Sequence, residues 1–223
     1  VNKDLQQFEL NIPTIDNNFI SCNLIRFSVT SSDHNLIIQN KNSQKTENYK
    51  SNLNSYLINY LGESIGVMIY VDNEIILSYK YKGRQFEINK VENQFFLFDV
   101  NDTKLKNSFT CQVEEKRSEI IRVNNLNESF SSSPKCLELA VEIDHYTRNT
   151  FGSNIATLNW AHAIIAGANQ VYASEVNLNI TVVNTVIWET VDPYANYVNS
   201  ASSMLSALKN HWINNNSSVT RDL

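Results

Sequence analysis

The sequence predicts an α+β protein with a β-rich first half and a second half in which strands and helices alternate. Up to residue 122 the chain consists mainly of short β-branched and aromatic runs separated by turn signals. From Cys136 onward the pattern changes to strand, helix, strand, helix. Residues 124–134, in between, are polar and serine-rich, which is typical of an exposed boundary. We therefore expect a β-rich domain at 1–123, a linker at 124–135 and an α/β domain at 136–223.

The first half is expected to form an antiparallel sheet with one helix. Its turn at 71–74, with Asp72 and Asn73 in the middle, predicts a tight hairpin. Residues 40–50 are polar and predict a loop. Residues 51–61 carry apolar side chains at spacings of three and four, which predicts a short amphipathic helix. Strands are predicted at 18–30, 36–39, 65–71, 74–81, 85–88 and 94–100.

The second half opens with a strand at 137–143, where apolar and polar residues alternate. A polar loop at 146–152 follows, and then a helix from 155 to 172 with Ser153 or Asn154 as its N-cap. Residues 179–188 are apolar on both faces, as in a strand covered on both sides. This order implies a right-handed parallel crossover. A second helix at 200–214 comes next, and 220–223 begins a third strand.

This succession of elements, together with one motif, resembles a known enzyme family. Leu137, Glu138, Leu139, Asp144 and His145 match, position by position, the I-E-L-x-x-x-x-D-H pattern that opens the catalytic domain of metzincin zinc metalloproteases of the reprolysin (adamalysin) group. The resemblance covers 136–223. It implies a β-rich propeptide followed by the N-terminal portion of an α/β metzincin-like catalytic domain. The implied activity is hydrolysis of protein or peptide substrates by zinc-activated water.

The zinc motif of that family, H-E-x-x-H-x-x-G-x-x-H, does not occur in these 223 residues. None of the four histidines is followed by Glu, and their spacing suits no metal, so each is expected to be a surface or cap residue. They are His34, His145, His162 and His211. We therefore expect no catalytic residue in this chain. It would be an inactive excerpt of a latent precursor that is secreted or at the cell surface, with its zinc ligands elsewhere.

Cys111 is the candidate latency residue that the resemblance implies. A thiolate can fill the open coordination position of a catalytic zinc and so block it. Gln112 follows it, where the usual latency motif has Gly, and the alternative is a small buried apolar side chain. The dibasic pair Lys116-Arg117 is a candidate processing site for a trypsin-like enzyme, or an ordinary solvated charge pair.

The resemblance also implies a structural calcium ion. Glu138 matches the family's Glu ligand by motif, and Asp222 matches an Asp at the start of a later strand by position. Carboxylate oxygens suit calcium, but two residues supply only part of the six or more ligands that it takes. The alternatives are a solvent-facing strand position for Glu138 and a loop position for Asp222.

Charge and composition argue against several classes of binding partner and of enzyme. With a net charge of -5 and a pI near 5.4, the chain has no basic patch for nucleic acid or an anionic membrane, and no apolar run long enough to span a membrane. The isolated Gly152 and Gly167 form no phosphate-binding loop, which argues against a doubly wound enzyme. A non-enzymatic two-domain binding or interaction protein remains an alternative, and the missing catalytic cluster favours it.

Overall fold

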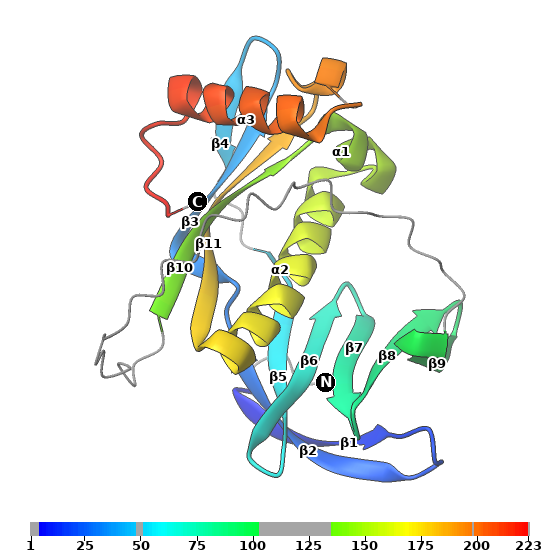
Figure 1. Ribbon diagram of the computed structural model, residues 1–223. Coiled ribbons are helices and arrows are strands. Elements are labelled where there is room, and N and C mark those ends of the chain that lie inside the picture. Colours follow the sequence, from blue (N-terminus) through cyan, green and yellow to red (C-terminus); the bar gives the residue numbers. More distant parts are fainter. Residues whose placement is uncertain (1–4, 48–50, 103–134, 198, 223) are drawn as a thin grey trace.

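The computed structural model describes residues 5–47, 51–102, 135–197 and 199–222. They form two β-sheets with one long helix between them (Figure 1). The mixed α+β class is as predicted, with a strand-rich first half and strand, helix, strand, helix in the second. Among the described residues no helix combines the length and the apolar character needed to cross a membrane.

The first sheet has seven strands in the order β1-β2-β5-β6-β7-β8-β9, and all neighbours are antiparallel. The predicted hairpin at 71–74 is present, since Asp72 and Asn73 both have the positive φ of a two-residue turn (50° and 65°). One face of the sheet buries a core around Tyr56, Tyr79 and Phe86. The strands are β1 Gln7–Pro13, β2 Phe19–Phe27, β5 Asn54–Tyr60, β6 Glu63–Val71, β7 Glu74–Tyr81, β8 Arg84–Val91 and β9 Gln94–Asp99, followed by a short 3-10 helix at Val100–Asp102.

The second sheet takes strands from both halves of the chain. Its order is β10 (Lys135–Ile143), β11 (Leu178–Trp188), β3 (Thr30–Gln39) and β4 (Gln44–Glu47). β10, β11 and β3 are parallel, and β4 returns antiparallel to β3. The predicted parallel crossover from β10 to β11 is therefore confirmed.

The hairpin of β3 and β4 corrects the expectation that each half has its own sheet. Leu36, Ile37 and Ile38 are all buried, so β3 needs cover on both of its faces. The second sheet provides it: Leu36 and Ile38 pack with Leu158 of the long helix, while Ile37 packs on the other face. The predicted division at 1–123, 124–135 and 136–223 stays a prediction, because 103–134 lies outside the described residues.

The long helix α2 (Asn154–Val176) is the central element of the molecule (Figure 1). Leu158 and Ala161 pack against the second sheet. Further along, Ala166 joins a cluster that includes Val67 and Ile69 of β6 and Val182 of β11. The helix therefore lies between the two sheets. Ser153 caps it by accepting a hydrogen bond from the Ala156 N–H (3.1 Å), as predicted.

Three local predictions were wrong. Residues 51–61 form strand β5 and its flanks, not a helix, because β5 is covered on both faces and its apolar residues therefore mimic helical spacing. The stretch predicted as a loop at 146–152 lies mostly in α1 (His145–Phe151), a polar helix without an apolar stripe. The predicted loop at 40–50 contains β4.

The remaining elements complete the second half. After β11 come a short 3-10 helix at Ala195–Tyr197 and α3 (Ala201–Asn215), which covers the face of the second sheet opposite α2 (Figure 1). Ser200 caps α3 by accepting from the Ser203 N–H. The contact is made by Trp212, which packs with Ile37 of β3 and Val186 of β11.

Candidate functional site

The motif on β10 and α1 organises the start of the second half. Asp144 is the N-cap of α1, and its Oδ1 accepts a hydrogen bond from the Thr147 N–H at 2.7 Å. The backbone N–H of His145 donates to Asp192 Oδ2 at 3.1 Å, which fixes the helix start to the loop after β11. In the described structure the Asp-His pair of the motif therefore positions α1.

Glu138 and Asp222 lie together, as their candidate pairing requires. The Asp222 N–H donates to the Glu138 carbonyl oxygen at 2.9 Å, and the Glu138 N–H donates to Asp222 Oδ2 at 2.9 Å. The contact places Asp222 beside β10, but 220–222 form no strand, so the third strand expected to begin at 220–223 is not present among the described residues. One oxygen of Asp222 is thus occupied by backbone. No group of three or more His, Cys, Asp or Glu in the described part of the chain could hold a metal ion, so these residues alone do not fit a zinc or calcium centre.

Glu142 joins three elements near the carboxyl ends of the parallel strands. Its two carboxylate oxygens accept hydrogen bonds from the indole N–H groups of Trp188 on β11 and Trp212 on α3. Tyr194 lies close by, and burial, aided by the Glu142 charge, raises the pKa of its phenol. Arg221 stacks over Trp212, 4.4 Å from the ring centroid. In the sequence Glu142 is one of the polar positions that alternate with apolar ones along 137–143, and the tryptophan that ends the strand at 179–188 was the available signal of a partner.

A largely apolar cavity of about 370 Å³ lies beside Glu142, between α2 and α3. Its apolar lining includes Trp160 and Ile164 of α2 and Leu208 of α3. The charged residues in the lining, Glu142 and Asp144, already bond to the two indoles and to the α1 N-terminus, respectively. The cavity therefore offers an apolar surface without a nucleophile and base held together.

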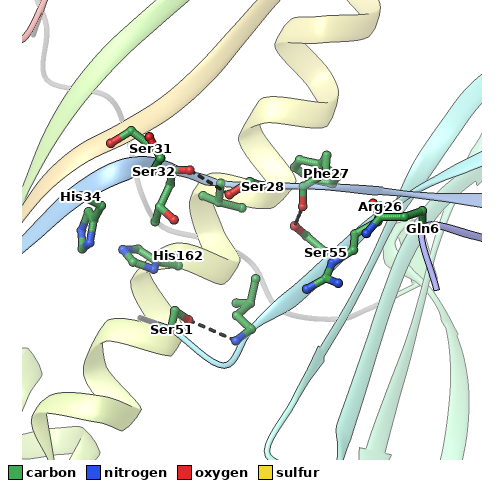
Figure 2. Close-up of a pocket in the computed structure, with 13 residues that line it drawn as sticks. Gln6, Arg26, Phe27, Ser28, Ser31, Ser32, His34, Ser51, Ser55 and His162 are labelled. Carbon is green, nitrogen blue, oxygen red and sulfur yellow. Dashed lines mark hydrogen bonds between the residues drawn. The ribbon is translucent and has the colours of Figure 1, made fainter. Parts of the chain in front are cut away.

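A second cavity, of about 490 Å³, lies where the first half meets α2 (Figure 2). His34 on β3 and His162 on α2 lie together in its wall, with ring centroids 5.2 Å apart and ring planes at 81°. Both Nε2 atoms reach the hydroxyl of Thr185 on β11, at 2.9 Å from His34 and 3.2 Å from His162. β3 of the first half thus meets α2 and β11 of the second half at the hydroxyl of Thr185.

The burial of these imidazoles corrects the expectation that every histidine is a surface or cap residue. His162 is 1% exposed and His34 is half-buried. Burial, together with the neighbouring His34, lowers the pKa of His162 to about 3, and burial lowers the pKa of His34 below its ordinary value. No local pattern could reveal the pair, because the two residues lie far apart in the chain and meet only through the β3–β11 pairing.

A polar cluster around Asn159 ties the same two halves together one turn before His162. Asn159 is 4% exposed, and its amide nitrogen donates to Asn52 Oδ1 (3.0 Å) and Asp72 Oδ2 (3.2 Å). Its amide oxygen accepts from the Ser51 hydroxyl at 2.8 Å. Buried amides need such partners, so this cluster fixes the position of the first sheet on α2.

The remaining predicted residues, Cys111 and the pair Lys116-Arg117, lie outside the described residues. Of the other two cysteines, Cys22 is buried in the core of the first sheet, and Cys136 is exposed at the start of β10.

Comparison with known proteins supports a likeness of the second half to a metallopeptidase family. Residues 133–221 match the model of metallo-peptidase family M12. No curated protein matches the chain. The matched segment begins just before β10 and ends beside Asp222, so it contains α1, α2, β11 and α3. This segment is therefore similar to part of a zinc metallopeptidase domain.

Proposed function

We propose that the chain is the propeptide and the N-terminal part of the catalytic domain of a latent, secreted zinc metalloendopeptidase of the reprolysin-like group. The match of residues 133–221 to metallo-peptidase family M12 carries this proposal. The motif from Leu137 to His145 supports it, because it stands on β10 at the start of the matched segment. The substrates would be proteins or peptides, and the zinc ligands would lie outside these 223 residues.

The first half is suited to act as a propeptide. It adds β3 and β4 to the edge of the matched segment's sheet at β11, and its β6 covers α2. The Asn159 cluster adds polar contacts between the same surfaces. A segment attached at all of these points could hold the second half in a single inactive arrangement.

Two metal roles belong to this proposal. The thiolate of Cys111 would occupy the open position of the zinc in the precursor. Glu138 and Asp222 would contribute to a calcium site whose further ligands come from elsewhere, and their contact at β10 is compatible with it. A solvent-facing strand position for Glu138 and a loop position for Asp222 remain the alternatives.

The test compares peptide hydrolysis by three proteins: this chain, the full-length gene product, and the full-length product cleaved after Arg117. We expect activity from the cleaved full-length product once fragment 1–117 has been removed from it, loss of that activity with a chelator, and none from this chain. A full-length sequence without His-Glu-x-x-His would overturn the proposal and favour the non-enzymatic interaction protein.

The latency role of Cys111 has a separate test in the full-length precursor. Cys111→Ala removes the thiolate, so a water would bind zinc and the uncleaved precursor should hydrolyse peptides. Cys136→Ala, at an exposed position of β10, is the matched control. If the Cys111→Ala precursor stays as inactive as its parent, latency comes from steric cover and the cysteine has no switching role.

A further inference from the structure

The cavity at the junction contains two imidazoles for which the proposed function has no use. His34 belongs to the β3–β4 hairpin of the first half, whereas His162 and Thr185 belong to the second. We propose that His34, His162 and Thr185 form an acid-sensitive latch, closed while both imidazoles are neutral, which releases the β3–β4 hairpin from the second half when they are protonated. Its use in freeing a propeptide rests on the proposed function; the latch itself does not.

The hydrogen bonds at Thr185 suit neutral rings. His162 Nδ1 is buried and has no partner among the described residues, so it is better left as a lone pair than as an N–H. His162 then donates from Nε2 to Thr185 Oγ1, and the Thr185 hydroxyl donates to His34 Nε2. Every hydrogen in this chain of bonds has an acceptor.

Protonation breaks the arrangement at two atoms. A protonated His34 can no longer accept from the Thr185 hydroxyl, since its Nε2 becomes a donor. A protonated His162 gains an N–H at Nδ1, which is buried without an acceptor. Two cationic rings 5.2 Å apart would also repel each other, and one of them, His162, is buried.

The surrounding charges do not compensate. Apart from the two histidines, the charged residue among the described residues that line the cavity is Arg26 of β2, and it is positively charged. Asp33 is next to His34 on β3, but it is exposed. Asp72 does not line the cavity and is hydrogen-bonded to Asn159 on α2. Other elements contribute uncharged hydroxyl groups: Ser51 from the stretch before β5 faces the cavity, and Thr185 from β11 contacts His34. No carboxylate from these elements lines the cavity to stabilise an imidazolium.

The pH window follows from burial. In the open state each ring regains its ordinary pKa near 6.5, while in the closed state the pKa of His162 is about 3. The open state therefore binds more protons, and the latch is fully closed above pH 6.5 and weakens as pH falls toward 3. His162 alone should increase the open population about 16-fold between pH 6.5 and 5, and by nearly tenfold per pH unit below that until pH approaches 3.

The experiment measures native-state hydrogen exchange of this chain at pH 6.5 and 5.0, expressed as protection factors so that the intrinsic pH dependence of exchange is removed. We expect the protection of the β3 amides at Leu36, Ile37 and Ile38 to fall about 15-fold or more, while that of β7 in the first sheet changes little. In His162→Gln the fall should be lost. His34→Gln, at a half-buried position, should reduce it even if His162→Gln does not fold. His145→Gln, whose ring contacts Asn149 on α1, is the control that should keep the full fall.

Unchanged β3 protection at pH 5.0, or an equal fall in both junction variants, would overturn the latch. So would ring NMR titrations of His34 and His162 near pH 6.5 with β3 still protected. No readout depends on peptidase activity. A pH-dependent latch in a protein whose full-length form stays inactive after cleavage and removal of fragment 1–117 would refute the proposed function alone, and an active processed enzyme with pH-independent β3 would refute the latch alone.

Discussion

Gly66 sits where strands β6 and β7 leave no room for a side chain. A Cβ at this position would lie 2.2 Å from the carbonyl oxygen of Ser78 and 2.5 Å from the Cα of Tyr79. Both atoms belong to the backbone of β7, which pairs with β6 in this register, so neither can move without breaking the ladder. By contrast, a Cβ at Gly167, in α2, would have no atom within 4 Å.

We expect opposite effects from alanine at these two glycines. Gly66→Ala should lower the free energy of unfolding by roughly 1–3 kcal/mol or more, because it overpacks a central strand. Gly167→Ala should raise it by about 0.4–1 kcal/mol, because alanine restricts the unfolded chain and favours the helix. Urea denaturation of both variants checks this. Equal stability of the Gly66→Ala variant and the parent would mean that the two strands are farther apart than described.

Asn159 offers a second test at the level of one residue. Its buried amide forms hydrogen bonds with Ser51, Asn52 and Asp72. In Asn159→Ala the side chains of these three residues lose that hydrogen-bond partner and must bond to water or remain unpaired. The expected loss is about 1–3 kcal/mol in the free energy of unfolding by urea. Asn210→Ala, at an exposed position of α3, should change it by less than about 0.5 kcal/mol. Similar values for the two variants would contradict the role of the cluster.

Single residues were predictable where their role is local. Ser153 as a cap of α2 and Asp72-Asn73 as a hairpin turn follow from side-chain chemistry within a few residues. The buried roles of Asn159 and His162 are not local. A buried polar residue looks like a surface residue in sequence, and its burial depends on partners that only the fold supplies.

At the level of elements, β10, β11 and α3 meet at one carboxylate. Both oxygens of Glu142 accept from indole N–H groups, those of Trp188 and Trp212, and so connect the sheet to the helix that covers it. Glu142→Gln replaces one acceptor oxygen by an NH₂ group that would face an indole N–H. We expect a loss of about 1–3 kcal/mol in stability and a change in tryptophan fluorescence in the folded state. Glu175→Gln, at an exposed position near the end of α2, should show neither; if it matches Glu142→Gln, the effect is one of net charge.

Elements were predictable where one period dominates. The alternation in β10 and the apolar stripe in α2 identify a half-buried strand and a long helix, and both are present. The apolar period is misleading at β5, since burial on both faces removes the alternation and leaves apolar residues at spacings that also fit a helix. It is uninformative at α1 for the opposite reason: this helix is polar all round, and its caps Asp144 and Gly152 define it instead.

At the level of the whole molecule, the two halves share a core. β3 extends the sheet of the second half, and α2 of the second half covers the sheet of the first. The change of composition near residue 124 suggests separate domains. Composition depends only on residues that are neighbours in the chain, so it cannot reveal the β3–β11 pairing, which joins distant segments. Propeptide removal, in the proposed function, would therefore require more than cutting the chain.

A cut in the chain at the candidate processing site should therefore leave the halves associated. After specific cleavage following Arg117, we expect fragments 1–117 and 118–223 to elute together in size-exclusion chromatography at pH 7.5. Val67→Asp, which places a charge in the buried contact of β6 with α2, should weaken this association, because an unpaired buried charge is strongly unfavourable. Ile76→Asp, on β7 at a position 39% exposed, should not. If the unmodified fragments separate at once, the peptide chain alone holds the halves together, and cleavage by itself would be enough to release the first half.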